Sequence, residues 1–304
     1  MAFELMLGHG VGSEIRRLLD RQLALAIDKL HGAPPDVAGA RRHIKKTRAL
    51  LLLARPAFAT TDALASRLKK ASRLLGPITD AQTMIQTLTK LRRYDPRRLP
   101  QKTIVKLRMA LAEDARRLIG GVEAAWLRAR VIRLLKHERM MLAKVDFSNC
   151  SVHSTAAAIR RAHRDARGAR KASATAPGID SLHAWRRRSK AEWYLLRLVH
   201  QVARGRLKDD QRRIEQLDRC LGDAHDLAVL EQRVTTRSPL SRSQSAAALR
   251  ALHAYAGDLK RRTSILADAQ DESPRDLEAR VLALWLSGAG GLAAREVTSW
   301  RRRA

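Results

Sequence analysis

Two stretches of this sequence carry basic side chains at a spacing that suits a phosphate-rich ligand. The first lies within residues 36–55 and the second within residues 181–204, and in both the basic residues recur every three or four positions. Residues at these intervals share one face of a helix. The two stripes consist of Arg41, Arg42, Lys45 and Arg48, with Lys46 beside them, and of His183, Arg186, Arg187 and Lys190. Because like charges on one helix face repel each other, each stripe indicates an anionic partner.

The stretch before each stripe adds further basic residues. They are Arg16, Arg17 and Arg21 in the first case, and Arg160, Arg161, Arg164, Arg167, Arg170 and Lys171 in the second. A solvated helix face is the ordinary fate of a run of charges, but such faces normally mix positive and negative side chains. Between residues 160 and 190 the only acidic residues are Asp165 and Asp180. This imbalance favours a binding surface.

The composition of the whole chain indicates phosphate as the partner chemistry. The 304 residues include 60 Lys and Arg against 30 Asp and Glu, a formal net charge of +30, and Arg outnumbers Lys by 46 to 14. The planar guanidinium offers paired donors that match phosphate oxygens, which a lysine ammonium cannot do. A genome rich in G and C would explain the preference for Arg over Lys, but not the twofold excess of bases over acids. A polyanion is therefore the expected ligand.

The elements that must position these side chains are helices. Hydrophobic residues make up 45% of the chain, and Pro and Gly number only 9 and 16. Apolar residues recur with helical periodicity along nearly the whole sequence, so the predicted fold class is all-α. The predicted helices cover about 13–30, 36–55, 61–75, 80–93, 102–144, 154–173, 181–204, 209–221, 226–235, 241–269, 274–286 and 292–303. Ser13 and Glu14 are expected to begin the first helix, and Gly222 to end the helix over 209–221.

The sequence also repeats itself at an offset of about 145 residues. Ile15-Arg16-Arg17 aligns with Ile159-Arg160-Arg161, Arg41-Arg42 with Arg186-Arg187, and Leu75-Gly76 with Leu221-Gly222. The order is kept and the offset hardly drifts, which indicates an internal duplication. We expect one domain over residues 1–304, built from two pseudo-symmetric helical halves at about 13–146 and 152–270. A C-terminal helical extension is expected over 274–303.

These motifs resemble those of the CHAD domains, helical domains named for their conserved histidines. The family pattern on the second helix of each half is His-x-x-Arg-Lys-x-x-Lys, followed by an Arg or an aromatic residue. The matching residues are His183, Arg186, Arg187, Lys190 and Trp193-Tyr194, and in the first half Arg41, Arg42, Lys45 and Arg48. Ala38 stands where the first half would carry the family histidine. The resemblance covers both halves, from about residue 13 to residue 270.

A second family motif, Gly-x-x-Arg-Asp, joins the third and fourth helices of each half. The matching residues are Gly76 and Asp80, and Gly222 and Asp226, while Thr79 and His225 replace the Arg. We expect the glycines to supply the left-handed conformation that ends a helix. The aspartates are expected to cap the following helix and to pair with a nearby Arg such as Arg73 or Arg219.

The resemblance implies that each half is a four-helix bundle and that the two bundles are related by a pseudo-twofold axis. It also implies binding of inorganic polyphosphate in a central basic groove, lined by the first two helices of each half. Some family members also associate with polyphosphate granules. Many contacts acting together would make long chains bind more tightly than short ones. The expected polyphosphate-binding residues are Arg16, Arg17, Arg21, Arg41, Arg42, Lys45, Lys46, Arg48, Arg160, Arg161, Arg164, Arg167, His183, Arg186, Arg187 and Lys190.

No catalytic residue, metal site or cofactor is predicted, so the protein is expected to be a binding protein and not an enzyme. The sequence has no glycine-rich phosphate loop and no nucleophile elbow. Its histidines are too scattered to form a metal site. His183 is expected to donate hydrogen bonds to phosphate or to shape the groove. The residues expected in the core are Trp126, Trp193, Tyr194 and Trp285.

The expected location is the cytoplasm, with polyphosphate granules as a candidate site. The two cysteines, Cys150 and Cys220, are far apart in the sequence and suggest no disulfide framework. No run of about 18 apolar residues predicts a membrane span. The N-terminus lacks the basic start of a signal peptide. The tail Trp300-Arg-Arg-Arg303 is expected to be a frayed end.

Two other functions stay open. A diffuse basic surface could bind nucleic acid, but aromatic residues make up only 4% of the chain, so stacking platforms for single strands are not expected. No recognised DNA- or RNA-binding motif is visible. The chain could instead be an accessory subunit of a polyphosphate-metabolising enzyme. Competition with DNA tests the first alternative, and a phosphate-release assay with magnesium or manganese tests the second.

Overall fold

The computed structural model describes residues 3–6, 8–97 and 99–288, and every regular element in these ranges is a helix. The elements are α1 (Val11–His31), α2 (Val37–Leu53), α3 (Thr61–Leu74), α4 (Gly76–Tyr94), α5 (Gln101–Gly120), α6 (Val122–Ala143), α7 (Val152–Thr175), α8 (Ile179–Leu198), α9 (Lys208–Thr236), α10 (Arg242–Leu266), the 3-10 helix η1 (Ala267–Gln270) and α11 (Pro274–Gly288). The all-α prediction is confirmed.

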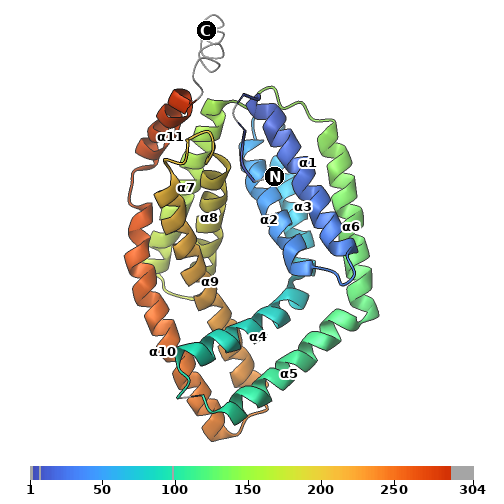
Figure 1. Ribbon diagram of the computed structural model, residues 1–304, viewed down its shortest axis with the longest axis vertical. Helices are drawn as coiled ribbons and strands as arrows, with labels where there is room; N and C mark the ends of the chain where they lie inside the picture. The colour runs from blue at the N-terminus through green and yellow to red at the C-terminus, as the bar shows by residue number, and fades with distance from the viewer. Residues whose placement is uncertain (1–2, 7, 98, 289–304) are drawn as a thin grey trace, which may run out of the picture.

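The helices gather into two upright groups above a lower one (Figure 1). On one side α1 packs against α2 and α6, and α2 packs against α3. On the other side α7 packs against α8 and α11, and α8 packs against α9. In the lower part α4 packs against α5 and α9, and α9 packs against α10. Helix α11 belongs to the predicted C-terminal extension, and it packs along α7 as α6 packs along α1. Residues 289–303 of that extension lie outside the described residues.

Buried apolar side chains form three clusters that hold these groups together. The largest cluster joins the two upright groups, since it contains Leu23 of α1 and Leu195 of α8. The second fills the lower part, with Leu91 of α4 and Leu230 of α9. A smaller third cluster surrounds Trp185 of α8. Both halves are therefore fixed to each other at the top by the first cluster and at the bottom by the second.

The residues before α1 also tie the two halves together. The backbone N–H of Leu5 donates to the carbonyl oxygen of Leu198 at 2.8 Å. The ring of Phe3 lies edge-on against that of Tyr194, with centroids 5.8 Å apart. Phe3 and Leu5 are both buried. This segment belongs to the first half of the sequence but packs on the end of α8.

The beginning of α1 differs from the predicted one. The helix begins at Val11, and the Ser13 hydroxyl donates to the carbonyl oxygen of Gly10 at 2.7 Å instead of capping a free N–H. The Glu14 carboxylate accepts a hydrogen bond from the backbone N–H of Met6 at 3.0 Å and pairs with Arg17 at 2.7 Å.

The glycines of the repeated Gly-x-x-x-Asp motif do not supply the predicted left-handed helix ends, although α3 does end just before Gly76. Gly222 lies inside α9, which is continuous over Lys208–Thr236, and Gly76 is the first residue of α4. Neither has a positive φ. The left-handed conformation occurs instead at Arg204 and Gly205, where the chain turns after α8.

The aromatic side chains expected in the core are not all buried. Tyr194 and Trp285 are buried, and Trp193 packs against the largest cluster. The prediction that Trp126 lies in the core is wrong, because 53% of this residue of α6 is exposed. Within the described ranges, none of the helices combines the length and the apolar character that crossing a membrane requires.

Candidate anion-binding site

The two predicted basic stripes lie on α2 and α8, and these helices pack against each other between the two halves. Lys45 of α2 shows how close the charges come. The pKa of Lys45 is lowered to about 8, first by burial and then by the nearby cations Arg41, Arg186 and Lys190. Its side chain nevertheless remains exposed to solvent. The structure thus brings cations from both halves around one accessible lysine.

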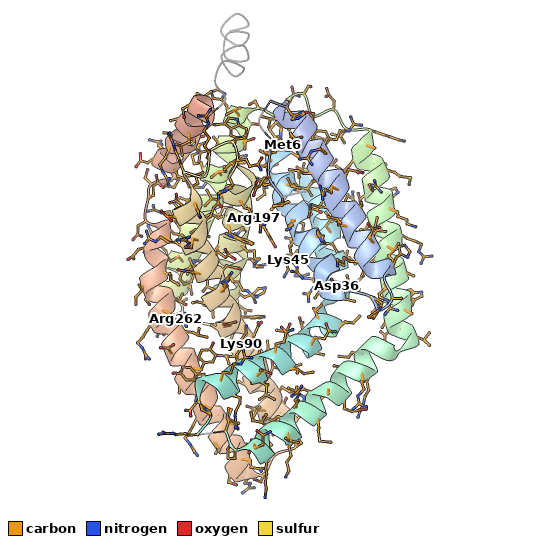
Figure 2. The ribbon with its side chains drawn as sticks, viewed as in Figure 1. Met6, Asp36, Lys45, Lys90, Arg197 and Arg262 are labelled. Carbon is orange, nitrogen blue, oxygen red and sulfur yellow. The ribbon has the colours of Figure 1, made fainter. Side chains whose placement is uncertain are left out.

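The same arrangement continues along α2 in both directions. Burial lowers the pKa of Arg48, and the nearby Arg187 and Arg73 lower it further. Burial also lowers the pKa of Lys46 to about 8, with Arg197 and Arg42 as the cations that add to the effect. Figure 2 shows Lys45 and Arg197 between α2 and α8.

We call this region the α2–α8 basic surface. It consists of Arg41, Arg42, Lys45, Lys46, Arg48, Arg73, His183, Arg186, Arg187, Lys190 and Arg197.

One arginine of each stripe is held by the Asp of the glycine motif. Arg41 pairs with Asp80 at 3.2 Å, and its Nη1 also donates to the carbonyl oxygen of Gly76 at 3.5 Å. Arg186 pairs with Asp226 at 3.6 Å. The two aspartates therefore orient arginines of the second helix of each half.

The partners expected for these aspartates are wrong. Arg219 pairs with Glu215, four residues earlier on α9, at 2.6 Å. Arg73 lies beside the cation Arg48 instead of beside Asp80. The sequence interval suggested a local contact, whereas the actual contact joins helices that pack in the folded protein.

Packing space explains the glycine in α9. A Cβ atom at position 222 would lie 3.2 Å from Nη2 of Arg186, closer than an ordinary van der Waals contact. At position 76 the nearest arginine atom, Nη2 of Arg41, would be 3.9 Å away, which is an ordinary contact. Gly222 therefore makes room for the Arg186 guanidinium, and its role is close approach and not backbone conformation.

His183 lies against a second histidine, His225 of α9. Their ring centroids are 4.8 Å apart, and the Nδ1 atom of each is buried without a hydrogen-bond partner among the described residues. Burial, and then His225 and nearby arginines, lower the pKa of His183 to about 4, and burial likewise lowers the pKa of His225. Both rings are neutral at pH 7. In the first half Ala38 and Thr79 stand at the matching positions, so that half carries no such pair.

Lys190 is fixed in place by two kinds of contact. Its ammonium pairs with the buried carboxylate of Asp218, and it also lies over the ring of Trp193, 4.8 Å from the centroid. One carboxylate oxygen of Asp218, Oδ1, is buried without a partner among the described residues. Lys190 therefore presents its charge from a defined position.

Two arginines of the surface have buried donors that nothing in the described chain satisfies. They are the Nε atoms of Arg41 and Arg48. Buried donors are nearly always hydrogen-bonded, to protein or to water. The two Nε groups are therefore donors without an acceptor among the described residues.

The predicted residues on α1 are placed differently. Arg16 donates to the carbonyl oxygen of Ala143 at the end of α6, and the guanidinium of Arg17 is held by Glu14 at 2.7 Å. Arg21 is half-buried further along α1. The structure does not place Arg16 and Arg17 among the cations of the α2–α8 basic surface.

The predicted residues on α7 contact several elements. Arg160 pairs with Glu278 of α11 at 2.8 Å, and Arg167 donates to the carbonyl oxygen of Asp271 at 2.6 Å. Arg164 lies 3.8 Å from Asp165. Arg161 lines a pocket between α2, α7 and α8. Arg160 and Arg167 therefore hold the segment before α11 and α11 itself.

Two members of the surface were missed by sequence reasoning. Arg197 continues the helical spacing seven residues after Lys190, so the period of the stripe could have found it. Arg73 lies on α3, and no local pattern links it to α2. Among the described residues, no three His, Cys, Asp or Glu side chains form a group that could hold a metal ion.

Comparison with known proteins gives the family. The sequence model of the CHAD domain matches residues 14–235, which is well over half of the chain. A crystal structure of the CHAD domain from the plant Ricinus communis is similar at 17% identity and a TM-score of 0.47, with 93% of this chain and 90% of that chain covered. No curated protein matches the sequence. From the match of the family model, this chain belongs to the CHAD domain family.

Proposed function

We propose that this protein binds inorganic polyphosphate along the α2–α8 basic surface, in a groove between its two halves. Membership in the CHAD family is consistent with polyphosphate binding in general. The observation that carries the proposal is the packing of cations from both halves around Lys45, although like charges that lie close together repel each other. An anion between α2 and α8 removes this repulsion.

The chemistry of the surface suits phosphate oxygens. The buried Nε donors of Arg41 and Arg48 lack acceptors in the described chain, and phosphate oxygens are strong acceptors for guanidinium groups. Arg41 and Arg48 lie seven residues apart on one helix, which corresponds to about 10 Å. A ligand that contacts both must therefore be extended, as a polyphosphate chain is.

The proposed mode of action is binding without catalysis. The cations supply charge neutralisation and hydrogen bonds, and the protein would act in the cytoplasm or at polyphosphate granules. Incubation with polyphosphate and magnesium or manganese tests this part, and release of phosphate would contradict it.

A titration with long-chain polyphosphate tests the proposal. The variant Arg48→Gln/Arg187→Gln removes one cation from each stripe without breaking an ion pair in the described chain. The matched control, Arg133→Gln/Lys136→Gln, removes the same charge from the exposed side of α6. We expect the first variant to bind at least tenfold more weakly than wild type, and the control to bind within about twofold of it.

Double-stranded DNA at equal phosphate concentration serves as the competitor. Polyphosphate binding that resists this competitor agrees with the proposal. Even competition by DNA, together with equal effects of the two variants, would replace it with a diffuse basic surface that binds nucleic acid.

A further inference from the structure

A pocket opens where α2 meets α7 and α8, and three arginines line it. They come from three elements: Arg55 follows α2, Arg161 lies on α7 and Arg188 on α8. The rest of the lining consists of Leu52, three alanines and Asp165, which is the single acidic residue that lines the pocket. The lining thus carries three positive charges against one negative charge.

Arg161 differs from the other two arginines of the pocket in its hydrogen bonds and ion pairs. Arg55 is oriented by Asp62 at 2.9 Å, and Arg188 lies 3.4 Å from Asp165. Within the part of the chain that the structure describes, Arg161 makes no hydrogen bond and no ion pair. Burial lowers the pKa of Arg161, and the nearby Arg55, Arg160 and Arg164 lower it further, while Glu278 of α11 acts in the opposite direction. A half-buried guanidinium among other cations favours a bound anion.

The pocket lies at one end of the α2–α8 basic surface. Arg188 follows Arg187 in the sequence, and Lys69 of α3 lies within electrostatic reach of Arg48, Arg187 and Arg188. A polyanion on the surface could therefore continue to the pocket without leaving positively charged surroundings.

The walls of the pocket favour the end of a chain over its middle. The helices α2, α7 and α8 pack against one another pairwise, so their contacts close the inner side of the pocket. To place an internal phosphate in the pocket, the polyphosphate chain would have to enter and leave through the same opening. A terminal group needs the chain to enter only. A terminal phosphoryl group also presents three free oxygens and carries more charge than an internal one, which suits several arginines.

We propose that this pocket binds the terminal phosphoryl group of a polyphosphate chain, with Arg161 as its principal donor and Arg55 and Arg188 beside it. The proposal rests on the proposed function, since it assigns one end of the same ligand. It makes chain ends, and not only chain length, a determinant of affinity.

The test compares long-chain polyphosphate with a chain of equal length whose two ends are blocked as phosphoramidates. Wild-type protein should bind the blocked chain about tenfold more weakly than the free one, because charged hydrogen bonds to the terminal group are lost. Arg161→Gln should bind both chains with the weaker affinity. Arg133→Gln, on the far side of α6, should retain the wild-type preference for free ends.

Arg161→Lys supplies a second variant that keeps the charge and the fold. It should lose most of the end preference, because an ammonium cannot give the paired donors of a guanidinium. Equal binding of free and blocked chains by wild type would overturn the assignment of the pocket and leave the α2–α8 basic surface unaffected. Failure of wild type to bind either chain would overturn the proposed function itself.

Discussion

The two lysines at the centre of the α2–α8 basic surface are the residues whose charge responds most readily to a ligand. Lys45 and Lys46 both have a pKa lowered to about 8, with burial as the largest cause. An arginine in the same surroundings stays protonated near neutral pH. The surface therefore combines fixed charges with two charges that are partly lost just above neutral pH.

Polyphosphate binding should therefore take up protons. A bound polyanion favours the ammonium form and raises both pKa values, so affinity should fall as the pH rises from about 7 to about 9. Titration calorimetry near pH 8.5, in two buffers of different ionisation enthalpy, measures the uptake. The variant Lys45→Arg/Lys46→Arg keeps its charge and should show little uptake. The same proton number in both proteins would assign the uptake to other groups.

Gly222 offers a test of how finely Arg186 is placed. Alanine at this helix-interior position favours the helix by about 1 kcal/mol, but its Cβ would displace the Arg186 guanidinium. We expect Gly222→Ala to keep its stability while its polyphosphate affinity falls several-fold. Gly76→Ala is the matched control, because there the added Cβ meets only ordinary contacts. Thermal unfolding and a polyphosphate titration of both variants measure the two effects, and equal affinities would argue against this role for Gly222.

At this scale the sequence predicted the residue types of the site better than their partners. The spacing of Arg186 and Lys190 was sufficient to place them on one helix face. It could not show that Asp226 and Asp218 hold them, because these contacts join α8 to α9 and depend on how helices pack. The pairing of His183 with His225 was missed for the same reason.

Helix ends agree with the local sequence signals where those signals act alone. Ser151 caps α7 with the reciprocal hydrogen bonds of a capping box, and it lies in the interval between the two expected halves. Local sequence signals failed to predict helix ends that depend on packing against other helices. Gly222 looks like a helix end, yet α9 continues through it, with Leu221 before it and Leu227 after it buried against other helices.

A buried ion pair holds the segment between η1 and α11 against α7 and α8. Nδ1 of His163 lies 2.5 Å from the Glu192 carboxylate, and Nε2 lies 2.8 Å from the carbonyl oxygen of Glu272. With acceptors on both sides, the ring carries two protons. The pair with Glu192 raises the pKa of His163 although burial opposes it. A raised pKa means that the pair stabilises the fold fully below the ordinary histidine pKa, and that this contribution is lost as the pH rises through the raised value.

Glu192→Gln should therefore lower the free energy of unfolding by roughly 3 kcal/mol at acidic to neutral pH, because it leaves a buried charge without its counter-charge. The difference from wild type should shrink as the pH rises. Denaturant unfolding at several pH values measures it. The control is Glu231→Gln, which breaks an exposed pair with His253 and should cost less than about 1 kcal/mol. Equal effects of the two substitutions would show that burial does not strengthen the first pair.

The whole molecule carries a formal net charge of +30, and this sets its response to salt. Each cation that contacts phosphate releases counterions, so the logarithm of the affinity should fall linearly with that of the salt concentration. Removing one contacting cation by Arg187→Gln should reduce the slope by about 1. Removing the exposed Arg133 should leave it unchanged. Titrations at several salt concentrations give both slopes, and identical changes would mean that no particular cations form the site.

The all-α fold was predictable from composition and periodicity because both act over the whole chain. The repeat predicted two halves, and in the structure α1 packs against α6 while α7 packs against α11. The contact of α2 with α8 was implied only by the family resemblance. No periodicity within one helix reveals which other helix it meets.

The break at Leu75 gives the molecule a mechanical asymmetry. In the first half α3 and α4 meet at this residue and continue in different directions, whereas in the second half α9 runs through the matching region as one rod (Figure 1). The ion pair of Arg41 with Asp80 spans the joint from the side. Any widening between the halves should therefore bend the chain at Leu75 and not within α9.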